Sequence, residues 1–197
     1  MSNQDEATNL KLFLEHRTHN VFSDRPVEDA TLRRIYDVAK MGPTSANSSP
    51  MRVAFVKSKE AKEKLRPLLS PGNVDKTMAA PVTAIVAQDL DFHTKVGKLF
   101  PHFPPMQGIL AGLEGAEKQF YLLQNASLGA AYLILAARAL GLDTGPMAGF
   151  DRAKTDEAFF AGTSWRSIML VNLGYGVHEK LMPRNPRLDF EEAATIV

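Results

Sequence analysis

The sequence predicts a single-domain protein built from layers of strands and helices, of the α+β or α/β class. Three runs rich in β-branched residues have the length of strands, and they alternate along the chain with segments of helical periodicity. The length of 197 residues is typical of one domain, and 45% hydrophobic with 23% charged residues is a globular composition. We therefore expect residues 1–197 to bury one hydrophobic core.

The shorter elements are predicted from apolar spacing and from capping residues. Apolar residues three and four apart indicate amphipathic helices, and Ser58 is a suitable N-cap for a helix that follows it. Continuous β-branched runs indicate strands. In chain order these elements are helices at 9–16 and 28–40, a strand at 51–56, a helix at 58–69 and strands at 81–87 and 167–173.

A long helix is predicted at 117–140, which is rich in Ala and Leu, contains no Pro and is followed by Gly141. Apolar residues occupy every face between Leu128 and Ala137, so we expect a central helix buried on all sides. In so small a protein a second subunit is expected to cover part of it, which predicts a dimer. The polar residues Gln124 and Asn125 help to make the uninterrupted apolar run too short for a membrane span.

Two segments fall outside this alternation. Residues 100–115 combine three Pro, three Gly and large apolar side chains, which predicts an irregular excursion that acts as a lid. Residues 183–197 follow a Pro-rich joint and regain helix-like amphipathicity, which predicts a C-terminal arm that embraces a partner chain.

Composition excludes several classes of function. The formal net charge of +1 provides no general field for nucleic acid or acidic lipid, so an anionic ligand should be small. The absence of Cys excludes disulfides, thiolate metal sites and cysteine nucleophiles. Asp5 and Glu6 stand where a signal peptide needs positive charge, so a cytoplasmic location is expected.

The common catalytic and nucleotide-binding motifs are missing from the sequence. There is no G-x-G-x-x-G after a strand, no P-loop, no zinc helix and no nucleophile elbow. Of the five His residues only His16 and His19 are close in sequence, and no carboxylate flanks them, so we predict no metal site. No side chain is predicted to act as a catalytic nucleophile or acid.

Two polar stretches in the first fifty residues could instead bind a phosphorylated, planar ligand. Arg17, Thr18, His19 and Asn20 end the first helix, and the Arg fork with the Thr hydroxyl matches a phosphate. A solvated helix end is an equally good interpretation of these four residues alone. Residues 42–50 contain no charge and four hydroxyls, which suits the edge of a heterocycle better than a plain turn.

Three further stretches are candidates for the same ligand. Asn73 and Lys76 lie three residues apart on one helical face, although a surface lysine is the simpler interpretation. The turn at 141–150 has three Gly that allow backbone to lie against a flat ligand, or it is only a connection. Arg184 and Arg187 flank Pro186 and could complete a phosphate clamp with Arg17, or be ordinary exposed arginines.

The order of these segments resembles the nitroreductase superfamily of flavin enzymes. It is similar in particular to the small flavin-dependent malonic semialdehyde reductases, a branch named also as NADH dehydrogenase/NAD(P)H nitroreductase. The matching motifs span nearly the whole chain: RTHN at Arg17, GPTSANSSP at Gly42, SPGNVDKT at Ser70, LFPH at Leu99, AAYLILAARALGLDTGPMAGFD at Ala130, DEAFFAG at Asp156, NLGYG at Asn172 and PRLDFEEA at Pro186.

The resemblance implies an α+β fold with a central antiparallel sheet, an intertwined homodimer and one FMN per subunit at the dimer interface. Carried over by motif, these residues would bind the FMN: Arg17, Thr18, His19, Asn20, Arg184 and Arg187 at the phosphate and ribityl end, Ser45 and Asn47 beside the isoalloxazine, Asn73 and Lys76 at its pyrimidine edge, and Ala148 and Gly149 through backbone near its reactive nitrogen.

The resemblance also implies a function. NADH or NADPH would reduce the FMN and a small-molecule acceptor would reoxidise it in the same pocket, with ping-pong kinetics and no catalytic side chain. The branch points to reduction of malonic semialdehyde to 3-hydroxypropanoate, and broad nitroarene or quinone reduction is the alternative. A flavin-binding protein without turnover is the alternative from another class, because every residue named binds rather than reacts.

Overall fold

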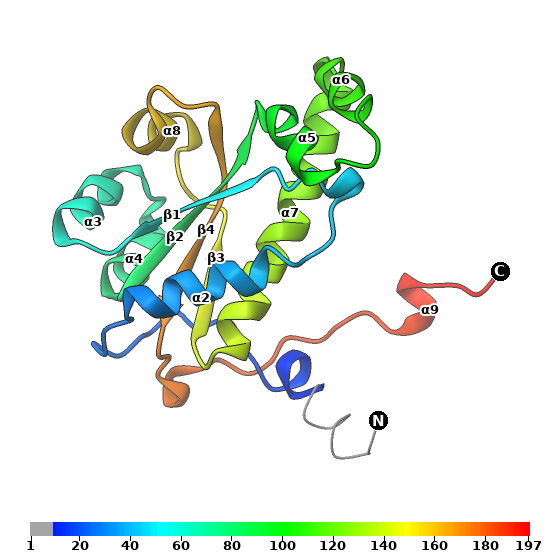
Figure 1. Cartoon of the computed structure of the whole chain (residues 1–197). Coiled ribbons are helices and arrows are strands. Elements are labelled where there is room, and N and C mark those ends of the chain that lie inside the picture. Colours follow the sequence, from blue (N-terminus) through cyan, green and yellow to red (C-terminus); the bar gives the residue numbers. More distant parts are fainter. Residues whose placement is uncertain (1–9) are drawn as a thin grey trace.

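The computed structural model describes residues 10–197. The first predicted helix is present as residues 10–14, and Asn9, Asp5 and Glu6 lie outside the described residues. A four-stranded antiparallel sheet with strand order β1-β2-β4-β3 lies at the centre (Figure 1). Its strands are β1 (Met51–Val56), β2 (Val82–Asp89), β3 (Asp143–Met147) and β4 (Trp165–Gly174). The sheet confirms the α+β class.

Helices cover both faces of the sheet. The main ones are α2 (Asp29–Ala39) and α7 (Gly115–Ala139) on one face, and α3 (Lys59–Leu65), α4 (Val74–Ala79) and α8 (Arg152–Phe160) on the other. The shorter helices are η1 (Ser45–Asn47), η2 (Arg66–Leu68), η3 (Pro71–Asn73), η4 (Phe92–Lys95), α5 (Val96–Leu99), α6 (Met106–Ala111), η5 (His178–Lys180) and α9 (Phe190–Ala193).

The central strand β2 explains why its sequence is a continuous apolar run. All eight of its residues are buried, because Val82, Ala84 and Val86 pack toward α2 and α7 while Ile85 and Ala87 pack toward the opposite layer. Each face of the sheet therefore has its own hydrophobic cluster.

The capping prediction for α3 is confirmed. The Ser58 hydroxyl oxygen accepts a hydrogen bond from the amide of Ala61 at 3.2 Å. The helix ends earlier than predicted, at Leu65, and continues as the 3₁₀ helix η2 with Pro67 inside it. A proline offers no amide to an α-helix, which accounts for the change of helix type.

The expectation that the long helix is buried all round is wrong for the single chain. Phe120, Leu123, Leu128 and Tyr132 on α7 form an apolar stripe whose exposed fractions range from 38% to 69%. By length and composition alone α7 could cross a membrane, but 44% of its most apolar window is buried against the rest of the protein. The opposite side of α7 packs on the sheet as a core helix.

The excursion at 100–115 is more regular than predicted. It contains α6, and Phe100 and Met106 pack with the end of α7 in a third hydrophobic cluster around Phe92 and Leu122. Phe103 stays 43% exposed. The apolar residues of this segment therefore have a cluster of their own to cover, which the sequence did not reveal.

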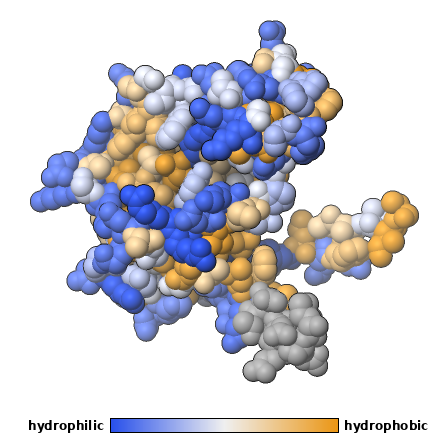
Figure 2. All heavy atoms as spheres, in the orientation of Figure 1, coloured by the Kyte–Doolittle hydropathy of each residue, from blue (hydrophilic) through white to orange (hydrophobic). Residues whose placement is uncertain are grey.

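The C-terminal arm, residues 183–197, extends away from the body of the molecule (Figure 1). Every residue in it is exposed, and helix is limited to the four residues of α9, which begins with a capping box between Asp189 and Glu192. Figure 2 shows apolar residues along this arm, among which Leu188, Phe190 and Ile196 are 56–89% exposed. An apolar segment held away from its own core requires another surface to cover it.

Candidate functional site

The N-terminal segment is fixed along the sheet next to β3 and the end of β4. Thr18 forms a parallel bridge with Thr144, and the His19 amide donates to the Thr144 carbonyl at 3.0 Å. Four residues later, Phe22 forms an antiparallel bridge with Gly176. These pairings place the RTHN motif at the start of β3, beside the chain that leads into the arm.

A strongly basic pocket of about 420 Å³ lies where these two segments meet. It brings together five residues predicted for the phosphate end of the ligand, Arg17, Thr18, Asn20, Arg184 and Arg187. Arg138 and Lys180 also line it, and among residues 10–197 no acidic side chain does. Cations without carboxylates are the donor set that a phosphate requires. Sequence reasoning missed Arg138 and Lys180 because one lies in the core helix and the other in a short turn.

The arginines of this basic pocket also connect the N-terminal and C-terminal segments. Arg17 Nη2 donates to the Met182 carbonyl at 2.7 Å, and Arg184 Nη2 donates to the carbonyls of Leu14 and His16. Arg138 Nε donates to Thr144 Oγ1 at 3.0 Å, and burial lowers the pKa of this arginine. Each guanidinium has five N–H donors, so these contacts leave donors for a ligand.

His19 is the member of the RTHN motif that does not line the basic pocket. Its side chain is 1% exposed, and its Nε2 lies 3.2 Å from a carboxylate oxygen of Asp143. Burial lowers the pKa of His19, and the Asp143 charge offsets part of that effect. The imidazole of His19 therefore faces away from the basic pocket, because the bridge at Thr18 turns the next side chain inward.

His19, Asp143 and His178 form a cluster that sequence spacing could not reveal. One ligand-capable atom of each lies within 4.8 Å of the others, so the three could in principle hold a metal ion. The second Asp143 oxygen already accepts the Gly176 amide at 2.9 Å and lies 3.8 Å from His178 Nε2. The cluster thus joins the RTHN motif, β3 and the end of β4.

Replacing Gly176 with Ala is expected to destabilise this junction by about 1–3 kcal/mol. An added Cβ would lie 2.0 Å from His19 Nδ1, so either the imidazole or the backbone at Asp143 must move. The free energy of unfolding from urea titrations measures the effect. Gly108→Ala on α6 is the matched control, since its Cβ would meet no atom within 4 Å. Equal stability of the two variants would contradict tight packing at Gly176.

A second group of predicted residues meets at the far end of β3. Asn73 Nδ2 donates to the Gly149 carbonyl at 2.8 Å, and the Ser70 amide donates to the same oxygen at 3.1 Å. Ala148 is exposed, and Lys76 on α4 is partly exposed. Ala148 lies four positions after Thr144, the bridge partner of the pocket residue Thr18, which is a span of roughly 13 Å. The two groups therefore suit the two ends of one elongated ligand.

Ser45 and Asn47 lie on a separate, strained loop. Ala46, Asn47 and Ser49 have φ of 50°, 47° and 41°, a region that non-glycine residues seldom occupy. The loop is held in place, since Asn125 Oδ1 accepts the Ser45 amide at 2.7 Å and Asn47 Nδ2 donates to a carbonyl of α5 at 2.8 Å. Both predicted residues are exposed, and neither lines the basic pocket.

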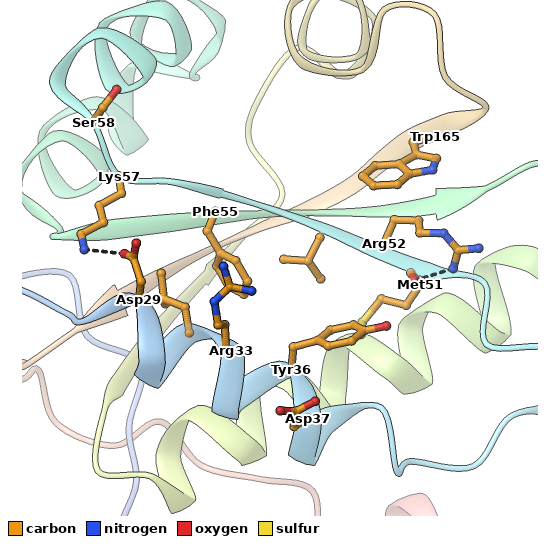
Figure 3. Close-up of a pocket in the computed structure, with 12 residues that line it drawn as sticks. Asp29, Arg33, Tyr36, Asp37, Met51, Arg52, Phe55, Lys57, Ser58 and Trp165 are labelled. Carbon is orange, nitrogen blue, oxygen red and sulfur yellow. Dashed lines mark hydrogen bonds and ion pairs between the residues drawn. The ribbon is translucent and has the colours of Figure 1, made fainter.

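A larger groove of about 1030 Å³ follows the edge strand β1 (Figure 3). One wall is the exposed side of α2, and Phe55 and Trp165 contribute aromatic surface beside the strand. An ion pair of 2.7 Å between Lys57 and Asp29 closes one end. We name this cavity the β1 groove. The β1 groove could not be predicted from the sequence, because its lining residues come from α2, β1 and β4, which are far apart along the chain.

Comparison with known proteins shows to which family this chain belongs. Residues 14–175 match the Nitroreductase family. A Stenotrophomonas maltophilia protein provisionally named NADH dehydrogenase/NAD(P)H nitroreductase is 58% identical over 98% of this chain and 97% of its own length. A similarly named Burkholderia lata protein is 58% identical over 94% of each chain.

Solved structures agree with this assignment at the level of the fold. A Streptococcus pneumoniae nitroreductase family protein superposes with a TM-score of 0.85 at 25% identity, over 96% of this chain and all of that chain. An Exiguobacterium sibiricum protein described as a nitroreductase in complex with FMN gives 0.87 at 20% identity, over 95% and 96%. On the family match and the close relatives together, the chain belongs to the nitroreductase family.

Proposed function

We propose that this protein is an FMN-dependent NAD(P)H oxidoreductase. The observation that carries the proposal is the basic pocket, whose cations without carboxylates fit a phosphate monoester. Arg17, Arg184 and Arg187 would donate to the phosphate, with Thr18 and Asn20 binding it or the adjoining ribityl chain. The buried His19 side chain, beside Asp143, would hold these residues in place from the protein interior.

The other end of β3 would hold the ring system. Asn73 and Lys76 would bind the pyrimidine edge, and Lys76 would place positive charge where negative charge develops. Exposed Ala148 and the adjacent Gly149 backbone would lie near the reactive nitrogen. When bound, FMN would supply hydride exchange between a nicotinamide and an acceptor. The residues of this chain would orient both reactants and exclude water, with the 100–115 segment serving as the lid.

The relatives support the same reaction class. The close curated relatives are named for NAD(P)H nitroreductase activity, and one neighbour of the same fold is described with FMN. Reduction of nitroarenes or quinones is therefore one candidate for the physiological reaction. Reduction of malonic semialdehyde to 3-hydroxypropanoate is the more specific candidate reaction, and it is supported by the sequence motifs alone.

The experiment starts from the colour of the purified protein. We expect a yellow protein that releases FMN on denaturation, bleaches anaerobically with NADH or NADPH and recovers its colour when an acceptor is added. A yellow protein that neither nicotinamide bleaches would support the non-catalytic alternative. A colourless protein that takes up no FMN would contradict both. Rates with aldehyde, quinone and nitro acceptors would then rank the candidate substrates.

We further propose that the working form is a homodimer that completes the site. Ser45 and Asn47 would reach the flavin of the partner subunit, which accounts for their exposure and for their distance from the basic pocket. The apolar stripe on α7 would be covered by the partner. The arm would lie in the β1 groove of the partner, where edge strand β1 offers unpaired backbone beside an apolar wall.

Replacing Arg187 with Ala is expected to weaken FMN binding by roughly tenfold to a hundredfold, which corresponds to about 1.5–3 kcal/mol for a charge-assisted hydrogen bond. Among residues 10–197 its guanidinium donates only to the carbonyls of Asn185 and Pro186, so its removal should leave the fold intact. Fluorescence titration with FMN measures the affinity. Arg66→Ala is the control, because this exposed arginine pairs with Glu63 outside the basic pocket. Unchanged affinity would reject a phosphate role for Arg187.

A further inference from the structure

Lys62 on α3 is a buried cation that the proposed function does not use. It is 5% exposed, and among residues 10–197 no carboxylate pairs with it. Its Nζ donates to the Thr77 carbonyl at 2.8 Å and to Thr83 Oγ1 at 2.7 Å. Burying an ammonium without a counter-ion is costly, and an apolar side chain of similar volume would usually serve stability better. This lysine therefore calls for a role other than stability.

The contacts of Lys62 continue through the sheet and return to α4. Thr83 on β2 donates from Oγ1 to Asn172 Oδ1 at 2.7 Å, and Asn172 Nδ2 on β4 donates to the Lys76 carbonyl at 3.1 Å. The network therefore holds two consecutive carbonyls of α4, those of Lys76 and Thr77. Both belong to a six-residue helix, in which the Lys76 carbonyl also accepts the Ala80 amide at 3.3 Å and the last four carbonyls of any helix need partners from outside it. A helix this short has little rigidity of its own.

The same helix carries the residues assigned to the pyrimidine edge of the flavin. Asn73 occupies the N-cap position of α4, and Lys76 is the third residue of this helix. We propose that Lys62, acting through Thr83 and Asn172, is a positioning residue that fixes α4 so that Asn73 and Lys76 meet the flavin. This inference rests on the proposed FMN site.

The network has the features that such a role requires. Its members come from α3, β2 and β4, so α4 is tied to the most buried part of the sheet rather than to a loop. Thr83 and Asn172 are both fully buried, and both β2 and β4 are central strands. A hydrogen-bonded network in a low-dielectric interior resists small displacements, since each lost bond leaves a buried polar atom unpaired.

The test compares Lys62→Met, Lys62→Gln and the exposed control Lys59→Met on the same helix. For Lys62→Met we expect at least tenfold weaker FMN binding. We also expect a two-electron midpoint potential of the bound FMN lower by about 30 mV, the equivalent of a tenfold loss of preference for the reduced form. Lys62→Gln keeps N–H donors without the charge, so it should recover a good part of the affinity. A merely structural lysine would change thermal stability without changing the potential.

The outcomes separate this inference from the proposed function. Lys62→Met with FMN affinity and potential equal to those of Lys59→Met overturns the positioning role while the flavin site stands. Parental protein that binds no FMN overturns the proposed function itself. If Lys62→Met fails to fold, Thr83→Val tests the same network, since it removes both the acceptor for Lys62 and the donor to Asn172. An unchanged potential in Thr83→Val also overturns the inference.

Discussion

Removal of residues 183–197 is expected to abolish both FMN retention and dimer formation. The deletion takes away Arg184 and Arg187, two of the cations of the basic pocket, and all of the exposed apolar arm. FMN affinity should fall by more than a hundredfold, since two charge-assisted contacts are lost together. Sedimentation velocity and the ratio of flavin to protein absorbance measure the two effects.

A shorter deletion separates the two roles of the arm. Ending the chain after Arg187 keeps both arginines and removes Leu188, Phe190 and the other apolar residues beyond them. We expect this variant to dimerise poorly while its chains still bind free FMN more tightly than chains that end at Met182. If the protein that lacks residues 183–197 were a stable yellow dimer, the arm would be needed neither for FMN binding nor for dimer formation.

Folding stability is expected to rise with pH between 8 and 10 because of Lys62. Burial lowers the pKa of this lysine in the folded protein to about 8, whereas an unfolded lysine titrates near 10.5. Above pH 8 the unfolded chain therefore binds more protons than the folded chain, and the free energy of unfolding increases. The contribution is nearly absent below pH 8 and reaches roughly 2–3 kcal/mol at pH 10, at 1.36 kcal/mol per pKa unit.

Paired urea titrations isolate this effect from other groups that titrate in the same range. The parental protein and Lys62→Met, both saturated with FMN, are unfolded at pH 7, 8, 9 and 10, and the difference in unfolding free energy is followed. The unfolding free energy of the parental protein minus that of Lys62→Met should increase as the pH rises, whatever its value at pH 7. A difference that stays constant would mean that Lys62 remains charged in the folded state up to pH 10.

Most of the fold could be predicted from local patterns, and the exceptions have physical reasons. The strands at 51–56, 81–87 and 167–173 were found because β-branched runs persist where both faces of a sheet are covered. Gly145 and Pro146 favour a turn over a strand in the sequence of β3. Proline is tolerated there because β3 is an edge strand, whose one ladder is with β4 and whose other side has a single bridge, from Thr144 to Thr18. Edge position is a property of the whole sheet, which local sequence does not report.

The residues of the candidate site likewise fall into those that the sequence could predict and those that it could not. Motifs of adjacent residues, such as RTHN and the Arg184 to Arg187 pair, could be recognised, and the structure brings most of their side chains into one pocket. Residues that join the site from distant elements could not, as for Arg138, Asp143 and Lys62. The inward orientation of His19 follows from its bridge to β3 and has no signal in the motif. Spacing predicts neighbours along the chain, whereas tertiary pairing decides which side chains meet.

The position of β1 at the end of the sheet has a consequence for how the protein can associate. The protein has both an open strand edge, at β1, and an exposed apolar arm that could bind such an edge. Two copies can exchange arms with each other, or each copy can pass its arm to the next one. Reciprocal exchange ends at two chains, whereas one-way exchange grows into open polymers. We expect the geometry of the joint at Pro183 and Pro186 to decide between them.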